Sequence, residues 1–381
     1  MATGKGTRPI GNGGSMNQKA RARRNRKITI FFIEIVIILA MIGILWVIMD
    51  KTEEAEGLIY TDTKEIAPEE LGISEVVQEQ VQEAESPMAG YLNIALFGVD
   101  ALSSSSKDLL KGYRSDSIMI ASINLDTCDV KLVSVYRDTY LNLSNDTYTK
   151  CNTAYAKGGA QQAVSMLNAN LDMDITNWVS VSYKALITAI DDLGGIYIDV
   201  DSAELEHINN YQISIAKSLK LGENNYTPVT TKGYQKLNGL QASAYCRIRY
   251  TAGDDFKRAE RQREVLQAMM EEAKKANVND LLTFSADVLN YTYTSLDSET
   301  ITDLLSNITK YNIVDEGGFP AEDMRTTGTI GADGSCVVPL DLVDNVVWLH
   351  SFLFGDEEYH PSGTVQNYSV KIKSDTSKYL K

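Results

Sequence analysis

The chain has 381 residues, of which 44% are hydrophobic, and it carries a formal net charge of −15. This composition is typical of a globular protein with a full core, and the length suffices for one large domain or two ordinary ones. With only three histidines, a His-based metal or catalytic centre is poorly supported. The lack of a Walker loop and of a G-x-G-x-x-G motif argues against a nucleotide site of either type.

The N-terminal part of the chain has the pattern of a membrane anchor. Residues 1–27 hold eight Lys or Arg and no acid, and we expect a disordered cytoplasmic tail. Residues 28–49 are apolar except for Glu34, and at about 1.5 Å per residue they span a hydrocarbon core of roughly 30 Å. A cleaved signal peptide is the alternative, but its apolar region would be only about 7–15 residues long. The basic tail places everything after the anchor outside the cell membrane, and it is too short for a DNA-binding fold, so no nucleic-acid partner is expected.

Three regions follow the predicted transmembrane helix. Residues 50–88 carry twelve acids and two lysines, which predicts an acidic stalk. Residues 89–354 are expected to form one extracytoplasmic domain, and residues 355–381 a mobile tail. An oxidising location permits a disulfide, but small buried thiols are an equal alternative. None of the four cysteines has the close spacing of zinc ligands: Cys128, Cys151, Cys246 and Cys336.

Within the folded domain, apolar runs of strand length alternate with helical patterns. Strands are predicted at 91–99, 117–123, 130–136, 178–182 and 196–200, the second and third forming a hairpin. Helices are predicted at 153–171, 183–193, 237–248, 256–276, 281–289, 298–308 and 340–354. Residues 201–236 are polar and weakly patterned, and 317–334 predict turns with short strands. Because several strands are apolar throughout, the predicted fold class is α/β, with a mixed central sheet covered by helices on both faces (an α-β-α sandwich).

Arginine is concentrated in one short stretch of this domain. Residues 247–263 contain five of the eight arginines that follow residue 50. The rigid guanidinium fork is suited to bidentate recognition of phosphate or carboxylate, and Lys does not replace it. A solvated helix face with interspersed glutamates is the alternative, and it applies most to Arg261 and Arg263.

Two acids lie beside predicted strands, close to further arginines. Asp100 directly follows the strand at 91–99. Asp116 lies between Arg114 and the strand at 117–123, and Arg137 follows the strand after that one. Two such carboxylates with arginines nearby suit a Mg²⁺ ion that bridges to a phosphate, because Mg²⁺ takes oxygen ligands from carboxylates and substrate phosphates. For either aspartate alone, a turn residue or a helix cap is the expected role.

These residues belong to blocks that follow one another along the chain in a fixed order. The blocks are Phe97-Gly98-Val99-Asp100, Arg114-Ser115-Asp116-Ser117-Ile118-Met119, Val133-Ser134-Val135-Tyr136-Arg137-Asp138-Thr139, Cys151-Asn152-Thr153-Ala154-Tyr155, Ile190-Asp191-Asp192-Leu193-Gly194-Gly195-Ile196, Leu237-Asn238-Gly239-Leu240-Gln241-Ala242, Arg247-Ile248-Arg249 and Asp255-Phe256-Lys257-Arg258 with Arg261-Gln262. From about Tyr91 to Met270, behind a single N-terminal anchor, the chain resembles the LytR-CpsA-Psr family of bacterial envelope proteins.

The resemblance implies a membrane-anchored, Mg²⁺-dependent phosphotransferase of cell-wall assembly. Such proteins move a glycopolymer (a teichoic acid, capsular or related polysaccharide) from undecaprenyl pyrophosphate to peptidoglycan. Two alternatives remain open: a hydrolase of the same polyprenyl pyrophosphate, and a non-catalytic regulatory protein that binds the lipid pyrophosphate.

Carried over residue by residue, the resemblance also implies the members of the site. Asp100 and Asp116 resemble the acids associated with Mg²⁺. Asp255 matches an acid that could act as the base, and it or Asp254 is expected to cap the helix that follows. The residues that resemble those gripping the pyrophosphate are Arg114, Arg137, Arg247, Arg249, Arg258 and Gln262, with Arg137 also expected to act in catalysis.

The chain departs from the family pattern at two places. The loop between Asp100 and Arg114 is long and serine-rich, and Tyr136 stands where the family often has proline. Neither change removes a charged group, so both bear on loop shape and acceptor choice. The resemblance further implies a lipid tunnel between the sheet and its helices, and Met269 and Met270 either line it or belong to the core.

Overall fold

The computed structural model describes residues 60–61, 66–83, 85–99, 109, 112–222, 224–249, 254–273, 275, 288, 291–296 and 312–379. The predicted tail at 1–27, the predicted transmembrane segment at 28–49 and the predicted helix at 298–308 lie outside the described residues, as does the helix at 281–289 except for Val288. Within the described ranges, no helix is both long and apolar enough to cross a membrane.

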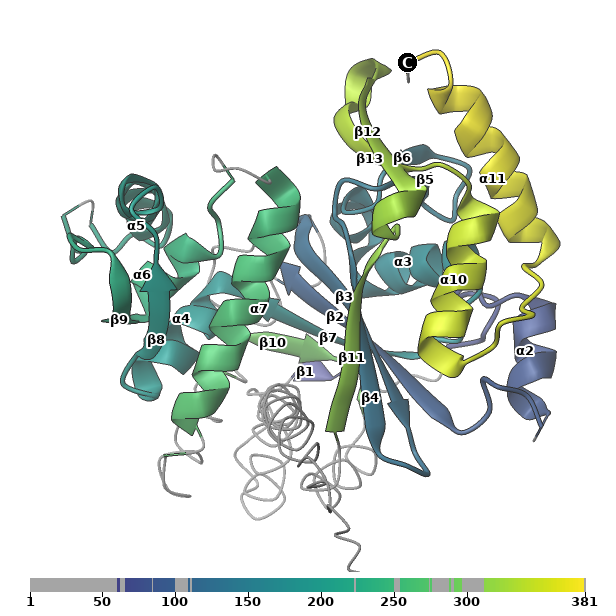
Figure 1. Cartoon of the computed structure of the whole chain (residues 1–381), viewed down its shortest axis with the longest axis horizontal. Helices are drawn as coiled ribbons and strands as arrows, with labels where there is room; N and C mark the ends of the chain where they lie inside the picture. Colours follow the sequence, from purple (N-terminus) through teal and green to yellow (C-terminus); the bar gives the residue numbers. More distant parts are fainter. Residues whose placement is uncertain are drawn as a thin grey trace, which may run out of the picture.

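In the described part of the chain, a seven-stranded mixed sheet runs through the centre of the domain (Figure 1). The strand order is β1-β10-β7-β2-β3-β4-β11, and β3 and β4 form the predicted hairpin. Strand β2 is antiparallel to β3 and parallel to β7, which confirms the prediction of a mixed sheet. The strands are β1 (Tyr60–Thr61), β2 (Tyr91–Val99), β3 (Ser115–Asn124), β4 (Asp129–Val135), β7 (Asn177–Ser182), β10 (Thr292–Thr294) and β11 (Asn312–Phe319).

Helices cover one face of the sheet and bury the larger hydrophobic core (Figure 1). Successive side chains of a strand point to opposite faces, so Ala95, Phe97 and Val99 of β2 enter this core together. The ring of Phe97 packs against that of Tyr155 with centroids 5.3 Å apart. The helices on this side are α2 (Glu75–Gln82), α3 (Thr153–Leu171), α10 (Leu342–Phe354) and α11 (Gly363–Thr376).

The opposite face of the sheet carries a second group of helices with a core of its own. Leu96 and Gly98 of β2 lie between the residues of the first core and therefore face this side. Ile208, Ile248 and Val265 are fully buried in the second core. The elements on this side are α4 (Tyr183–Asp192), α5 (Leu205–Ser218), α6 (Gly239–Tyr245), α7 (Asp254–Ala273) and the ribbon of β8 (Ile196–Val200) and β9 (Gly233–Leu237).

Two short antiparallel ribbons complete the described architecture. They pair β5 (Tyr140–Asn142) with β6 (Tyr148–Lys150), and β12 (Arg325–Ile330) with β13 (Gly334–Pro339). Single 3-10 turns lie at Glu322–Met324 (η2) and Gly331–Asp333 (η3). The predicted turn-rich stretch at 317–334 thus begins inside an edge strand of the main sheet, because β11 pairs in parallel with β4.

The predicted acidic stalk at 50–88 is wrong in its C-terminal half. Leu71, Val77 and Met88 are buried in the larger core, and Ser74 caps α2 by accepting a hydrogen bond from the amide of Val77. The described acids of this region face solvent, whereas most of its described apolar residues are buried in the larger core or pack against it. The folded domain therefore begins well before residue 89.

The predicted mobile tail at 355–381 is also wrong, because α11 lies within it and packs on the core. Val365 and Ile372 are buried, two turns apart on one helix face. Asp172 accepts hydrogen bonds from the amide (2.6 Å) and hydroxyl (2.7 Å) of Ser362, the residue that caps the helix. These contacts fix the C-terminal helix on the domain.

Candidate functional site

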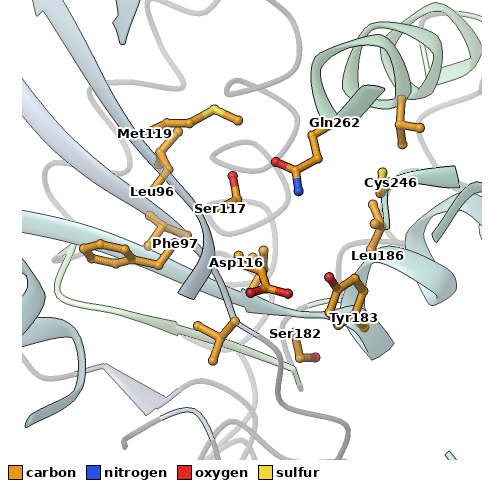
Figure 2. Close-up of a pocket in the computed structure, with 15 residues that line it drawn as sticks. Leu96, Phe97, Asp116, Ser117, Met119, Ser182, Tyr183, Leu186, Cys246 and Gln262 are labelled. Atoms are coloured by element: carbon orange, nitrogen blue, oxygen red, sulfur yellow. The ribbon is translucent and has the colours of Figure 1, made fainter. Parts of the chain in front are cut away.

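An apolar cavity lies between the sheet and the helices α4, α6 and α7 (Figure 2). It spans about 810 Å³ including its open mouth, of which about 140 Å³ can hold the centre of a water-sized sphere. Its sheet wall consists of alternate residues that share one face, and Leu186 and Val265 close it from the helices. The sheet residues are Leu96, Gly98, Ser117, Met119, Val179 and Val181. The predicted tunnel between sheet and helices has its counterpart here, although Met269 packs in the neighbouring core instead of lining it.

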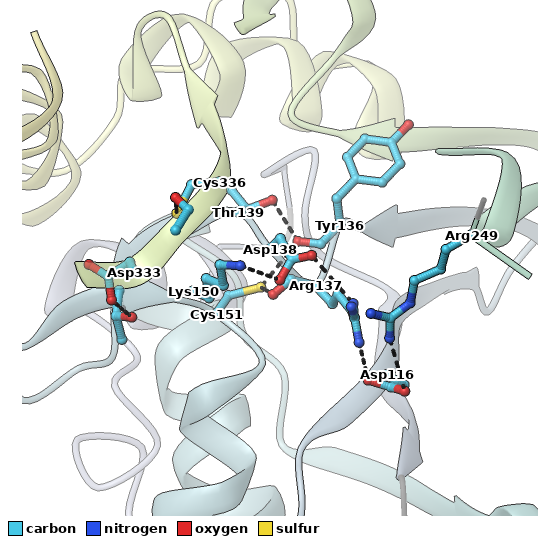
Figure 3. A network of polar contacts seen from close by, with 12 residues as sticks. Asp116, Tyr136, Arg137, Asp138, Thr139, Lys150, Cys151, Arg249, Asp333 and Cys336 are labelled. Carbon is cyan, nitrogen blue, oxygen red and sulfur yellow. Dashed lines mark hydrogen bonds and ion pairs between the residues drawn. The ribbon is translucent and has the colours of Figure 1, made fainter. Parts of the chain in front are cut away.

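A second recess, open and basic, borders the same part of the sheet (Figure 3). It encloses about 840 Å³, and we call it the basic crevice. Asp116 lines both the crevice and the apolar cavity, so the two spaces meet at its carboxylate. The charged residues of the crevice are Arg114, Asp116, Arg137, Asp138, Lys150 and Arg249.

A network of ion pairs connects these charged side chains (Figure 3). Asp116 Oδ1 accepts a hydrogen bond from Nη1 of Arg137 at 2.5 Å, and its Oδ2 lies 3.9 Å from Nη2 of Arg249. Asp138 lies 3.5 Å from Nε of Arg137 and 3.2 Å from Nζ of Lys150. With Arg114 included, four cations share two carboxylates, so the crevice keeps a positive charge suited to phosphate.

Backbone hydrogen bonds fix the turn after β4 that presents Arg137. The amide of Tyr136 donates to the carbonyl of Phe319 in β11 (3.0 Å), and the hydroxyl of Thr139 donates to the carbonyl of Tyr136 (2.6 Å). The amide of Asn152, just before α3, donates to the carbonyl of Arg137 itself (3.1 Å). The turn that carries Arg137 is therefore pre-organised. Pre-organised groups are effective at stabilising charge that develops during a reaction.

A buried ion pair holds the segment that carries Arg247 and Arg249. Nε of Arg261 lies 2.7 Å from a carboxylate oxygen of Glu204, and its Nη1 donates to the carbonyl of Ile248 at 3.2 Å. The side chain of Arg261 is only 2% exposed. The solvated-face alternative is therefore wrong for Arg261, which supports the site from behind.

The structure brings most of the predicted site residues together. Arg258 and Gln262, one turn apart on α7, border a small recess of about 310 Å³. Asp116 and Arg137 border the same recess, and Gln262 also reaches the apolar cavity. Four predicted residues line the basic crevice: Arg114, Asp116, Arg137 and Arg249.

Arg247 is placed apart from the crevice. Its guanidinium lies over the rings of Tyr183 (5.1 Å) and Tyr211 (5.8 Å). Tyr183 itself lines the apolar cavity, so Arg247 belongs to the helical side of that cavity. Its role toward pyrophosphate stays a prediction.

The two remaining predicted acids are only partly placed. Asp100 lies outside the described residues. Asp255 lies in the first turn of α7, which begins at Asp254, and its side chain is not among those described. Within the described residues, no group of three or more His, Cys, Asp or Glu side chains could hold a metal ion. The predicted roles of Asp100 and Asp255 therefore stay predictions.

Lys150 and Asp138 are members of the site that the sequence patterns did not single out. Asp138 follows Arg137 directly, and Lys150 precedes the block that begins at Cys151. Asp138 lies within a matched family block and Lys150 directly precedes one, which is the signal that could have identified them. Lys150 adds a point charge to the crevice, and Asp138 holds it beside Arg137.

Two buried cysteines, Cys151 and Cys246, are poorly suited to nucleophilic chemistry. All four cysteines are free, and Cys151, Cys246 and Cys336 are buried. Burial raises the pKa of the Cys151 thiol, and it raises the pKa of Cys246 to about 12. A thiol with such a pKa stays protonated at neutral pH, so neither residue supplies a thiolate.

The model of the LytR_cpsA_psr family matches residues 59–335. The chain belongs to the LytR-CpsA-Psr family. The match begins before residue 89, which agrees with the packing of residues 66–88 against the core.

Several curated relatives are similar to part of this LytR-CpsA-Psr chain. Biofilm regulatory protein A of Streptococcus mutans is 33% identical over 186 residues, which is 47% of this chain and 43% of that protein. The polyisoprenyl-teichoic acid–peptidoglycan teichoic acid transferases TagV and TagU of Bacillus subtilis are 31% and 30% identical over 170 and 194 residues. These matches cover 43% and 50% of this chain, and 40% and 55% of those proteins. The chain thus spans about half the length of the curated relatives it matches.

Solved structures share the LytR-CpsA-Psr fold described above. The protein gbs0355 of Streptococcus agalactiae has a TM-score of 0.57 at 25% identity, covering 76% of this chain and 92% of that one. TagT bound to LI-WTA has a TM-score of 0.50 at 20% identity, covering 78% of this chain and 95% of that one.

Proposed function

We propose that this LytR-CpsA-Psr protein transfers a glycopolymer from a polyprenyl-pyrophosphate carrier to peptidoglycan. The observation that carries the proposal is the position of Asp116, whose carboxylate borders both the apolar cavity and the basic crevice. A lipid carrier joins an apolar chain to a diphosphate. The apolar lipid chain would move from water into the cavity, and the diphosphate would bind the arginines. The names of TagU and TagV support the same class of reaction.

In the proposed reaction, an acceptor hydroxyl attacks the phosphorus that bears the glycopolymer. A new P–O bond forms to the acceptor, and the P–O bond of the anhydride breaks. The polyprenyl phosphate leaves with the electron pair of that bond, and the hydroxyl proton passes to a base. Arg137 and Arg249 flank Asp116 and would neutralise the charge that develops on the leaving phosphate.

The general base is proposed to be Asp255. It lies in the first turn of α7, one helical turn before Arg258 and two before Gln262, which border the same recess as Arg137. A carboxylate placed there would accept the proton of the acceptor hydroxyl. Arg258 and Gln262 would orient the phosphate during the transfer.

A magnesium ion is proposed at the meeting point of the two spaces. Asp116 offers one carboxylate there, and Mg²⁺ commonly takes one or two carboxylates together with substrate phosphates, so the donor chemistry fits. Asp116 and Asp100 would hold the ion, which would draw negative charge from the phosphate oxygens. The anchor at residues 28–49 would keep the domain on the outer face of the membrane, where carrier and acceptor meet.

One experiment separates the proposed transferase from its alternatives. The full chain in detergent is incubated with a polyprenyl-pyrophosphate-linked disaccharide, Mg²⁺ and a soluble peptidoglycan glycan. Product linked to the acceptor supports transfer. Sugar phosphate released equally without acceptor identifies a hydrolase instead. Tight donor binding without turnover identifies a regulatory protein, the alternative that the name of the Streptococcus mutans relative favours.

A further inference from the structure

A wide groove lies on the opposite face of α7 from the apolar cavity. It encloses about 1710 Å³ including its open mouth. Phe256, Glu260 and Arg263 line the groove, at spacings that place them on one helix face. Gln262 and Val265, about half a turn away around the helix, line the cavity. Helix α7 therefore stands between two recesses.

Aromatic and cationic side chains line the groove where it borders the site. Tyr136 lines both the groove and the small recess that Arg137 borders. Its ring packs edge to face on Phe256 with centroids 4.7 Å apart. The guanidinium of Arg325 lies 4.9 Å from the Tyr136 ring and 4.2 Å from the Phe256 ring, and it donates to the carbonyl of Pro320 at 3.0 Å. The wall of the groove is thus fixed at the residue next to Arg137.

The floor of the groove is bare backbone. Gly317 and Gly318 lie near the end of β11, and a Cβ at Gly318 would collide with the Tyr136 hydroxyl. A Cβ at Gly317 would come within 3.2 Å of the Trp348 ring, which stacks on Phe352. Glycine within a strand often marks a place where a ligand or another ring approaches closely. Because Gly317 and Gly318 have no side chains, the rings of Trp348 and Tyr136 can lie against their peptide groups.

The groove and the basic crevice differ in charge. Three cations and four carboxylates line the groove, whereas four cations and two carboxylates line the crevice. Within the groove, Lys257 pairs with Glu260 (2.7 Å) and Arg263 with Glu316 (3.6 Å). The exposed acids Glu322 and Asp323 form no ion pair with another described residue. A diphosphate or an anionic polymer is therefore directed to the crevice and away from the groove.

These features match a neutral saccharide. The apolar faces of sugar rings pack on aromatic side chains, as the groove offers at Phe256 and Trp348. Sugar hydroxyls donate to carboxylates such as those of Glu322 and Asp323, and these charge-assisted hydrogen bonds are the stronger kind. Amide groups of an amino sugar would pair with the open backbone of Gly317.

The geometry of phosphoryl transfer places the acceptor on this side. Attacking and leaving oxygens lie roughly in line through the phosphorus. In the proposed function the leaving lipid phosphate lies toward the apolar cavity, so the attacking hydroxyl enters from the opposite side of the recess. Tyr136 lines both that recess and the groove, so the groove adjoins the recess on this side. We propose that the groove is the acceptor subsite and binds the glycan strand of the acceptor, an inference that rests on the proposed transferase function.

The test compares two groove variants with a matched control in the full chain. E322Q/D323N removes two exposed charges at almost constant shape, and W348A removes an aromatic wall. E357Q/E358Q, which changes two exposed acids beyond the end of α10, is the control. The KM for a soluble peptidoglycan glycan and the KM for the lipid-linked donor are measured separately. Binding of chitotetraose, a neutral probe, is measured by saturation-transfer NMR without donor.

The groove assignment predicts a rise of roughly tenfold in the acceptor KM and in the chitotetraose Kd for E322Q/D323N, with the donor KM unchanged. An unchanged acceptor KM and an unchanged chitotetraose Kd in both groove variants would overturn the groove assignment. If the wild type still transfers the polymer, the proposed function is unaffected by that result. If the wild type binds glycan but shows no transfer, and the groove variants lose that binding, the groove is supported as a glycan site and the transferase function is refuted. Absence of both transfer and glycan binding in the wild type would refute both.

Discussion

Arg261 of α7 and Glu204, just before α5, form a buried ion pair with Nε and Oε1 2.7 Å apart. The same guanidinium donates to the carbonyl of Ile248, the residue between Arg247 and Arg249. Glu204 in turn accepts a hydrogen bond from the amide of Asp201 at 2.9 Å. One pair therefore ties α7, the start of α5 and the arginine segment of the crevice to each other.

Breaking this pair from one side should cost more stability than replacing it. Either R261M or E204Q leaves a buried group without its partner, and we expect the free energy of unfolding to fall by about 3–5 kcal/mol. The double variant E204L/R261M should recover most of that loss, because no charge stays buried. Urea unfolding of the three variants measures this. A loss below about 1 kcal/mol in both single variants would show that the pair contributes little.

The ion pair between Asp116 and Arg137 should be needed for turnover. R137A removes a positive charge that would stabilise the leaving phosphate, and D116A removes the carboxylate that holds Arg137 and would bind Mg²⁺, so we expect each to lower the rate of glycopolymer transfer at least about 100-fold. Circular dichroism should show a retained fold. K371A, on the distant helix α11, is the matched control and should keep wild-type rates. Near-wild-type transfer by D116A and R137A would refute the site assignment.

The apolar cavity should discriminate donors by chain length. Val181 lies on β7 and lines the cavity, so V181F would fill part of it. We expect the KM for a donor with a long polyprenyl chain to rise at least about fivefold, since displaced apolar surface returns to water. A donor with a two-isoprene chain should be unaffected. Equal effects on the two donors, measured side by side, would mean that the lipid lies elsewhere.

His350 should make the stability of the domain depend on pH. Burial lowers its pKa to about 4, and Nε2 lies 2.9 Å from the carbonyl of Leu171. In the unfolded chain its pKa is about 6.5. Between these values the unfolded chain binds the extra proton, so the free energy of unfolding falls as pH drops from about 6.5 to 4.

The variant H350Q isolates this effect. Asp172, whose pKa is raised by burial, titrates beside the histidine in both proteins, whereas burial raises the pKa of Tyr359 and keeps it protonated throughout, so the difference between wild type and variant reports the imidazole. We expect the wild type to lose about 2–3 kcal/mol more than H350Q across this pH range. Parallel pH profiles in chemical unfolding would show that His350 is not held neutral.

Local patterns carry the parts of the fold that the sequence predicts well. The apolar run at 91–99 coincides with β2 from end to end, and the helical spacing at 153–171 coincides with α3. Helices α5 and α11 escape prediction because each has few buried apolar residues among many polar ones. In α5 the buried residues Ile208 and Ile215 stand two turns apart. Their burial depends on neighbouring elements, which no local pattern records.

The same distinction holds for the site. Arg137 and Arg249 were predictable because arginine is scarce elsewhere and clustered here, and both converge on Asp116 in the structure. The partner of Arg261 was not predictable, because Glu204 is 57 residues away in a weakly patterned stretch. Burial of that arginine depends on how α5 and α7 pack, and the sequence around it resembles any solvated helix face.

The shared position of Asp116 has a consequence for how products depart. In the proposed reaction the carrier is cut where the apolar cavity meets the basic crevice. The polyprenyl phosphate is then left in the apolar cavity, and the acceptor glycan that carries the new polymer is left in the proposed acceptor groove, so each product has its own exit. Neither product has to wait for the other, and each should obstruct a different reactant. Added polyprenyl phosphate should compete with the donor, whereas finished polymer should compete with the acceptor.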